Sequence, residues 1–162
     1  RKRTRKWTGK YLENSRWPNQ KDPSVKKKVK ETEADMWRIG MIKKSALEIY
    51  RTFKQEIAKE RIYDNTRGSS LLFKARTGVL RTKTYRAKYE GVDAVCIACG
   101  EEQETAEHLI MFCKGLHPIV QDDGAEFFKA LGFRDREGKI DLKRVDLTRR
   151  RLSDLWPKSR RE

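Results

Sequence analysis

The sequence predicts a mainly α-helical fold: a small helical domain that holds a compact module of three cysteines and one histidine, preceded by a disordered basic arm. Three observations support this prediction. Apolar residues recur every three to four positions in the middle of the chain, which is typical of amphipathic helices. Three cysteines and one histidine lie within eighteen residues, and Lys and Arg outnumber Asp and Glu by 39 to 24.

Composition indicates a modest hydrophobic core and a polyanionic partner. Of the 162 residues, 39% are charged and 36% are hydrophobic, and the formal net charge is +15. Globular domains average about 25% charged and about 45–50% apolar residues. Nucleic acid is the commonest partner for such a charge surplus and an acidic membrane surface is the second, with solubility alone as the alternative explanation.

The cysteine count and the hydropathy pattern bear on location. No apolar run approaches the ~18 residues of a membrane span, so no membrane-spanning segment is expected, and nucleic acid rather than a membrane is the expected partner. An odd number of cysteines disfavours a secreted disulfide framework. We therefore expect an intracellular protein, with the nucleus favoured. Because residue 1 is Arg rather than Met, we expect either a fragment of a longer polypeptide or a chain that has lost a leader.

Residues 1–24 are predicted to form the disordered basic arm. Residues 1–30 contain twelve Lys or Arg against two acids, with three aromatic residues and two prolines among them. Such an arm can contact phosphates through counterion release and stack bases on its aromatic rings. It can equally be a solvated linker or a nuclear-import signal, and the residues favour neither interpretation.

Residues 25–67 are predicted to form two amphipathic helices joined near Gly40. The first carries a sparse apolar stripe of Val25, Val29 and Met36. The second has apolar residues at i, i+4, i+7 and i+11, namely Ala46, Tyr50, Phe53 and Ile57. We interpret both as helices that pack on a core and assign no functional site to them.

Residues 68–118 are predicted to contain a basic helix followed by the cysteine–histidine module. The helix would turn Leu72, Ala75 and Val79 toward the core. Residues 66–89 contain no acid and seven basic residues, which are the candidate nucleic-acid contacts: Arg67, Lys74, Arg76, Arg81, Lys83, Arg86 and Lys88. Residues 90–108 are rich in acids, so internal ion pairs are the alternative role for some of these basic residues.

The module has the spacing C-x2-C-x8-H-x4-C, which predicts a metal centre with the ligands Cys96, Cys99, His108 and Cys113. A C-x2-C pair presents two thiolates from one turn, and Gly100 allows that turn to close at positive φ. Thr105 is expected to cap a short helix with His108 in its first turn and Cys113 at or past its end. Four ligands without an open position indicate a structural Zn²⁺ site, a zinc knuckle.

Two alternatives accompany this assignment. The cysteines could be buried without a metal, or one could be a Cys–His nucleophile, for which no third orienting group is evident. His117 is the weaker alternative to His108 as a ligand.

Residues 119–162 are predicted to form short helices and a basic tail. A helix from about residue 122 to 131 would bury Phe127, Phe128 and Leu131, with Gly132 as its C-terminal cap. A last helix is expected over residues 145–155, before Pro157.

These residues resemble a known family. Arg76-Thr77-Gly78, followed by Cys96-x2-Cys99-Gly100 and Glu104-Thr105-x2-His108-x4-Cys113, is similar to the zinc-binding segment at the C-terminal end of non-LTR retrotransposon polyproteins, most of all the tick-type proteins. The resemblance is clear over residues 68–118 and weaker toward the C-terminus. It implies zinc binding, a role in binding template RNA or target DNA, and a parent polyprotein with endonuclease and reverse transcriptase activities.

The chain itself lacks residues for those activities. We interpret its single Asp-Asp pair, Asp122-Asp123, as acids that stabilise the start of a helix through its dipole. The sequence also contains no acidic cluster that could hold two magnesium ions. The sequence therefore predicts a non-catalytic, zinc-stabilised module that binds RNA or DNA. The alternative is a zinc-stapled protein-interaction element that docks on other domains of the parent polyprotein through the module and the Phe127–Phe128 helix.

Overall fold

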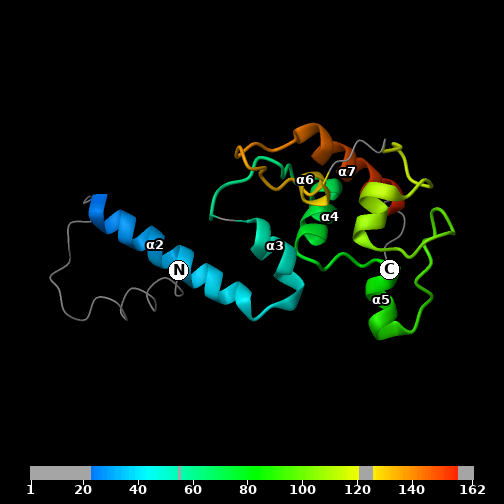
Figure 1. Ribbon diagram of the computed structural model, residues 1–162, viewed down its shortest axis with the longest axis horizontal. Coiled ribbons are helices and arrows are strands. Elements are labelled where there is room, and N and C mark those ends of the chain that lie inside the picture. The colour runs from blue at the N-terminus through cyan, green and yellow to red at the C-terminus, as the bar shows by residue number, and fades with distance from the viewer. Residues whose placement is uncertain (1–22, 55, 121–125, 157–162) are drawn as a thin grey trace. The chain divides into compact units, whose positions relative to one another are not determined.

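A computed structural model describes residues 23–54, 56–120 and 126–156 (Figure 1). Within these ranges the chain forms helices, turns and irregular segments, and its one β-bridge is the isolated antiparallel bridge between Val95 and Gln103. The prediction of a mainly helical fold is therefore confirmed. All but the last two residues of the predicted basic arm, the Asp122-Asp123 pair and the basic C-terminal tail lie outside the described residues. Among the described residues, no helix combines the length and apolar character needed to cross a membrane.

The chain divides into two compact units, Arg1–Gly40 and Met41–Glu162. Helix α2 (Pro23–Ile42) supplies the described part of the first unit. Its first residue is a proline, which is tolerated there because its missing N–H has no partner in the first turn. Helix α2 continues two residues past Gly40 and ends at Ile42, so the joint between the two predicted helices lies just after this glycine, which weakens a helix by only about 1 kcal/mol.

The second unit contains the remaining helical elements. In chain order these are η1 (Ser45–Leu47), α3 (Glu48–Phe53), α4 (Arg67–Arg76), α5 (Lys83–Glu90), η2 (His108–Phe112), α6 (Phe127–Ala130) and α7 (Leu142–Leu155).

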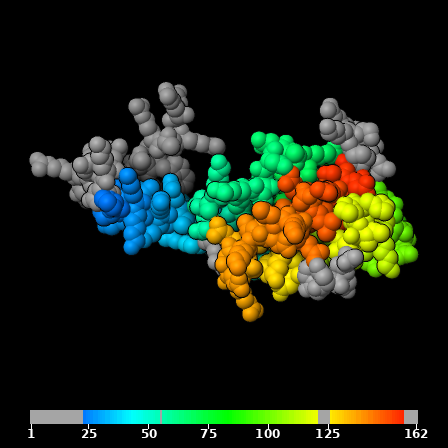
Figure 2. Space-filling model, turned by 90° about the horizontal axis from the view of Figure 1, so that it is seen from above, coloured from blue at the N-terminus to red at the C-terminus, as the bar shows by residue number. Residues whose placement is uncertain are grey.

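The main core lies where α4 and α6 pack against α7 (Figure 1). Leu72 of α4, Leu131 after α6 and Leu152 of α7 are 0% exposed, and each such side chain contributes about 1.5–3 kcal/mol through burial. A smaller cluster joins the cysteine–histidine module to the end of α7 through Leu109, Leu116 and Leu155. Figure 2 shows the segment that contains α7 (red) beside the module (yellow).

The predicted single basic helix is instead two helices, α4 and α5. Gly78 separates them at φ +68°, and a Cβ at this position would meet the carbonyl oxygen of Ala46 at 2.2 Å. Threonines cap both helices: the Thr66 hydroxyl accepts from Ser69 N at the start of α4, and the Thr82 hydroxyl accepts from Tyr85 N at the start of α5. Val79 therefore lies in the connecting turn, where it is 39% exposed, rather than in the core.

Three other helix predictions change in length. Helix α6 begins at Phe127 rather than near residue 122, and Glu126 before it has extended backbone. Helix α3 ends at Phe53, so Ile57 lies beyond the helix and is 58% exposed. Gly132 does end α6, with φ +76°. Helix α7 begins earlier than predicted because the Asp141 side chain accepts from Arg144 N and caps it there.

Candidate metal centre and basic pocket

The four predicted ligands come together. The donor atoms of Cys96, Cys99, His108 and Cys113 all lie within 4.8 Å of one another. The two sulfurs of Cys96 and Cys113 are 3.8 Å apart, and Cys99 Sγ lies 3.4 Å from His108 Nε2. A tetrahedral zinc ion with bonds of ~2.3 Å to sulfur and ~2.0–2.1 Å to nitrogen separates its ligands by roughly 3.5–3.8 Å. These side chains could therefore hold a metal ion, and His117 is not among them.

The first two ligands sit on a closed turn. Cys96 N donates to Glu102 O at 2.7 Å, and Gly100 N donates to Cys96 O at 2.8 Å. Gly100 has φ +71°, as the sequence predicts. These backbone hydrogen bonds close the turn and direct the two thiols toward the same point.

The other two ligands are brought together by a π-helical turn. His108 N donates to Thr105 Oγ1 at 3.0 Å, which confirms the predicted cap. Element η2 then follows the i→i+5 pattern, with Cys113 N donating to His108 O at 2.7 Å. Five residues in an ideal α-helix would place the two ligands about 140° apart. A π-helical turn contains more residues than an α-helical turn, so it brings Cys113 closer to the face that carries His108. This explains why four residues separate the two side chains.

Two further residues support the centre, and the sequence analysis did not identify them. Glu102 Oε2 lies 2.8 Å from His108 Nδ1, a contact that fixes the ring with Nε2 toward the thiols. Gly115 packs on the first turn, where a Cβ would lie 2.0 Å from Ala98 O. Two sequence features could have identified these residues: a carboxylate two residues after Gly100, and a glycine two residues after Cys113.

The thiols differ in their electrostatic surroundings. The backbone N–H groups of Glu101 and Glu102 lower the pKa of Cys99 to about 7. Burial raises the pKa of Cys113 to about 12. A thiolate in such a buried position needs a compensating cation. A divalent metal supplies that charge, so the chemistry of the donor set fits a metal ion.

Arg151 holds the chain segment that carries the last ligand. Its side chain is fully buried, at 0% exposure. It donates to four backbone carbonyls, those of Leu109 (3.2 Å), Cys113 (2.7 Å), Leu116 (3.0 Å) and Pro118 (2.6 Å). Sequence reasoning treated this arginine only as part of the last helix, because nothing local distinguishes it from Arg149 and Arg150.

One of the seven predicted nucleic-acid contacts is wrong. Arg76 is 0% exposed. Its guanidinium forms two hydrogen bonds of 2.8 and 2.9 Å with Glu60, a third with Tyr63, and lies 4.3 Å from the ring centroid of Phe133. It is buried because α4 turns this position toward the core, where Glu60 neutralises its charge. Arg76 therefore cannot contact a ligand at the surface.

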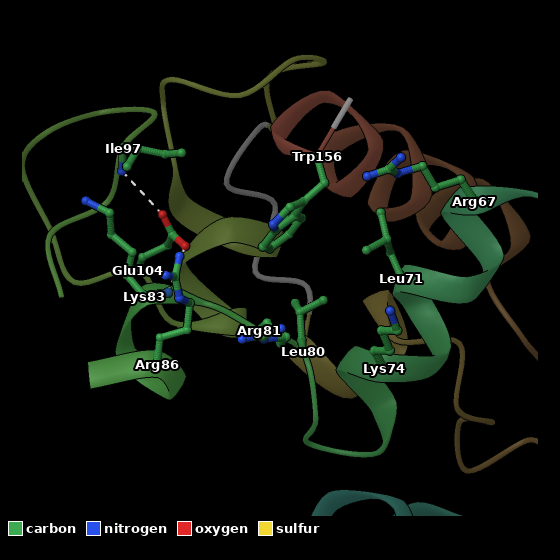
Figure 3. Close-up of a pocket in the computed structure, with 10 residues that line it drawn as sticks. All are labelled: Arg67, Leu71, Lys74, Leu80, Arg81, Lys83, Arg86, Ile97, Glu104 and Trp156. Carbon is green, nitrogen blue, oxygen red and sulfur yellow. Dashed lines mark hydrogen bonds between the residues drawn. The ribbon is translucent and has the colours of Figure 1, made fainter. Parts of the chain in front are cut away.

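Five of the other predicted contacts line one pocket of about 430 Å³ (Figure 3). They come from α4, from the turn after it and from α5: Arg67, Lys74, Arg81, Lys83 and Arg86. The apolar part of the lining consists of Leu71, Leu80, Ile97 and Trp156. Lys88, the seventh predicted contact, is exposed on α5 and is not part of this lining.

Ion pairs within the chain neutralise only part of the positive charge that lines the pocket. Arg81 and Arg86 share the carboxylate of Glu90, at 3.0 and 2.6 Å, which is the internal pairing considered as an alternative. Hydrogen bonds from Arg86 and Arg81 lower the pKa of Glu90. Within the described part of the chain, no ion pair involves Lys74 or Lys83.

No known family model matches this sequence, and no curated protein or solved structure is significantly similar to it.

Proposed function

We propose that this chain is a non-catalytic module that binds RNA or DNA through the basic pocket. The observation that carries the proposal is the convergence of five cationic side chains, separated by up to nineteen residues in the sequence, on one hollow. Only one carboxylate, Glu104, shares the lining. Phosphates are the natural ligands for such a cluster, because lysine and arginine side chains bind them while displacing condensed counterions.

We further infer that the four-ligand cluster holds a structural Zn²⁺. All four positions of a tetrahedral ion are filled by protein donors, and sites of this kind stabilise folds rather than activate water. The metal would fix the module against the start of α5 and the end of α7. On the strength of the motif alone, we also propose that the chain derives from the C-terminal part of a non-LTR retrotransposon polyprotein, with a nuclear location and other domains of the polyprotein as possible partners.

The alternative is a protein-interaction element that docks through the module and the Phe127–Phe128 helix. Phe128 stacks on Phe53 with centroids 4.7 Å apart, and both Phe127 and Phe128 pack against the main core. These rings are therefore engaged within the chain, which makes them poor docking groups. We favour the nucleic-acid function for this reason.

Fluorescence polarisation with a labelled single-stranded oligonucleotide tests the proposal. If Arg67, Lys74 and Lys83 each neutralise one phosphate, while Arg81 and Arg86 stay paired with Glu90, the logarithm of the association constant should fall with log[salt] at a slope of about −2.1. The double variant Lys74→Gln/Lys83→Gln should weaken binding and make this slope shallower by about 1.4. Lys143→Gln, an exposed lysine of α7 outside the pocket, is the matched control and should change little. Salt-independent binding, or equal effects of both variants, would refute the proposal.

A further inference from the structure

The basic pocket contains an aromatic ring that phosphate binding does not require. Trp156 follows α7, and its backbone N–H donates to Leu152 O at 3.2 Å, which fixes its position. The indole is half-buried and packs against both apolar clusters. It projects into the middle of the pocket, between Arg67 and Leu71 on one side and Glu104 on the other (Figure 3).

The rest of the lining is suited to a flat apolar group. Leu71 lies to the right of the indole and Leu80 below it, and Ile97 lies across the pocket from Leu71 (Figure 3). A volume of about 430 Å³ is within the roughly 300–1,000 Å³ range of small-ligand pockets. Apolar walls, one indole and a cationic rim together match a nucleotide, with its base inside and its phosphates at the rim.

A second hollow continues from the first. It has a volume of about 610 Å³ and shares Arg67 and Trp156 with the basic pocket. Its other arginines are already paired, Arg149 with Asp64 and Arg150 with Asp146. A chain of nucleotides could therefore pass over Trp156 from one hollow to the next, with its backbone charge held mainly at the first.

We propose that Trp156 is a stacking platform for an unpaired base, so that the site selects single-stranded over double-stranded nucleic acid. This inference rests on the proposed nucleic-acid function and adds the class of ligand to it. A base in a duplex has both faces covered by its neighbours, and only a base that has left the stack can reach an aromatic side chain. Stacking on indole also tolerates any base, so little sequence preference is expected.

The test uses the full chain with Trp7, Trp17 and Trp37 replaced by Phe, which leaves Trp156 as the only tryptophan of the four. Three probes carry about the same number of phosphates: an oligothymidylate, an abasic oligonucleotide of equal length, and a duplex of half that length. The oligothymidylate should quench Trp156 fluorescence and bind roughly 5- to 150-fold more tightly than the abasic strand, the range that one stacked base supports. The duplex should leave the fluorescence unchanged.

The outcomes separate the two proposals. Equal, salt-sensitive binding of all three probes without quenching would overturn the stacking site and leave the phosphate-binding function intact. No binding of any probe would overturn both. As a check that does not depend on quenching, Trp156→Phe should keep most of the preference for the oligothymidylate over the abasic strand, whereas Trp156→Leu should lose it with the circular dichroism spectrum unchanged. If Trp156→Leu does not fold, the comparison of probes on the single-tryptophan protein still decides the question.

Discussion

The carboxylate of Glu104 accepts a hydrogen bond of 2.9 Å from the backbone N–H of Lys83. The same carboxylate accepts a longer bond, 3.3 Å, from Ile97 N within the Cys96–Cys99 turn. Glu104 is only 3% exposed, so this side chain is a fixed link between the first turn of α5 and the metal centre. The position of the basic helix therefore depends on the folding of the cysteine–histidine module.

Loss of the Glu104 link should loosen α5. Glu104→Ala removes the buried carboxylate that accepts from Lys83 N and Ile97 N, and we expect the free energy of unfolding to fall by about 1–3 kcal/mol. Affinity for an oligonucleotide should fall with it, because Lys83 and Arg86 would no longer be held at the pocket. Urea unfolding and fluorescence polarisation measure the two effects. Glu107→Ala, an exposed acid of the same segment, should change neither quantity, and an equal loss in that variant would contradict the role of the link.

Metal removal should affect stability and binding together. We expect purified protein to contain close to one zinc ion per chain, measured by inductively coupled plasma mass spectrometry. Structural zinc contributes about 10–16 kcal/mol of apparent binding energy in small domains, which is large for a chain that is only 36% hydrophobic. A strong chelator, or Cys96→Ser, should therefore unfold the module, detected as a loss of helical circular dichroism and of salt-sensitive binding. A metal-free protein with unchanged thermal stability would contradict the zinc assignment.

Arg151 should control how tightly the metal is held. Its guanidinium binds four carbonyls, one of them that of the ligand Cys113. Lysine has one compact ammonium and cannot reach all four, and each buried carbonyl left unpaired costs about 1–3 kcal/mol. Arg151→Lys should destabilise the fold and weaken zinc affinity by about 10- to 100-fold, as loss of outer-sphere partners does. Competition with a chromophoric chelator measures the affinity. Arg150→Lys, on the exposed side of α7, is the control and should bind zinc like the unaltered protein.

The sequence predicted local features well and long-range ones poorly. The convergence of the four Cys and His side chains, the φ of Gly100 and the Thr105 cap follow from neighbouring residues, and all three are confirmed. The burial of Arg76 depends on Glu60, sixteen residues earlier, and nothing near Arg76 marks it as a core residue. The same holds for Arg151, whose partners lie 33–42 residues away. In a chain so rich in arginine, charge alone does not distinguish the residues that bind a ligand from those that hold the fold.

The Arg76–Glu60 pair should make stability depend on pH. Burial alone would raise the pKa of Glu60, but hydrogen bonds and positive charge from Arg76 and Lys54 lower it below its ordinary value. A depressed pKa means that Glu60 stabilises the folded state above its unfolded pKa of about 4.3 and loses this contribution as pH falls through the folded pKa. Glu60→Gln should therefore be less stable than the unaltered protein at neutral pH.

The difference between the two proteins should then shrink as the solution is acidified below about pH 4.3, because protonated Glu60 resembles glutamine in charge. Urea unfolding curves measured from neutral pH down to about pH 3 test this directly. Glu56→Gln serves as the matched control, since that exposed side chain pairs with Arg134 at 3.5 Å on the surface, where ion pairs contribute about 0–1 kcal/mol. A Glu60→Gln deficit that stays constant across this pH range would mean that the side chain acts through packing and not through its charge.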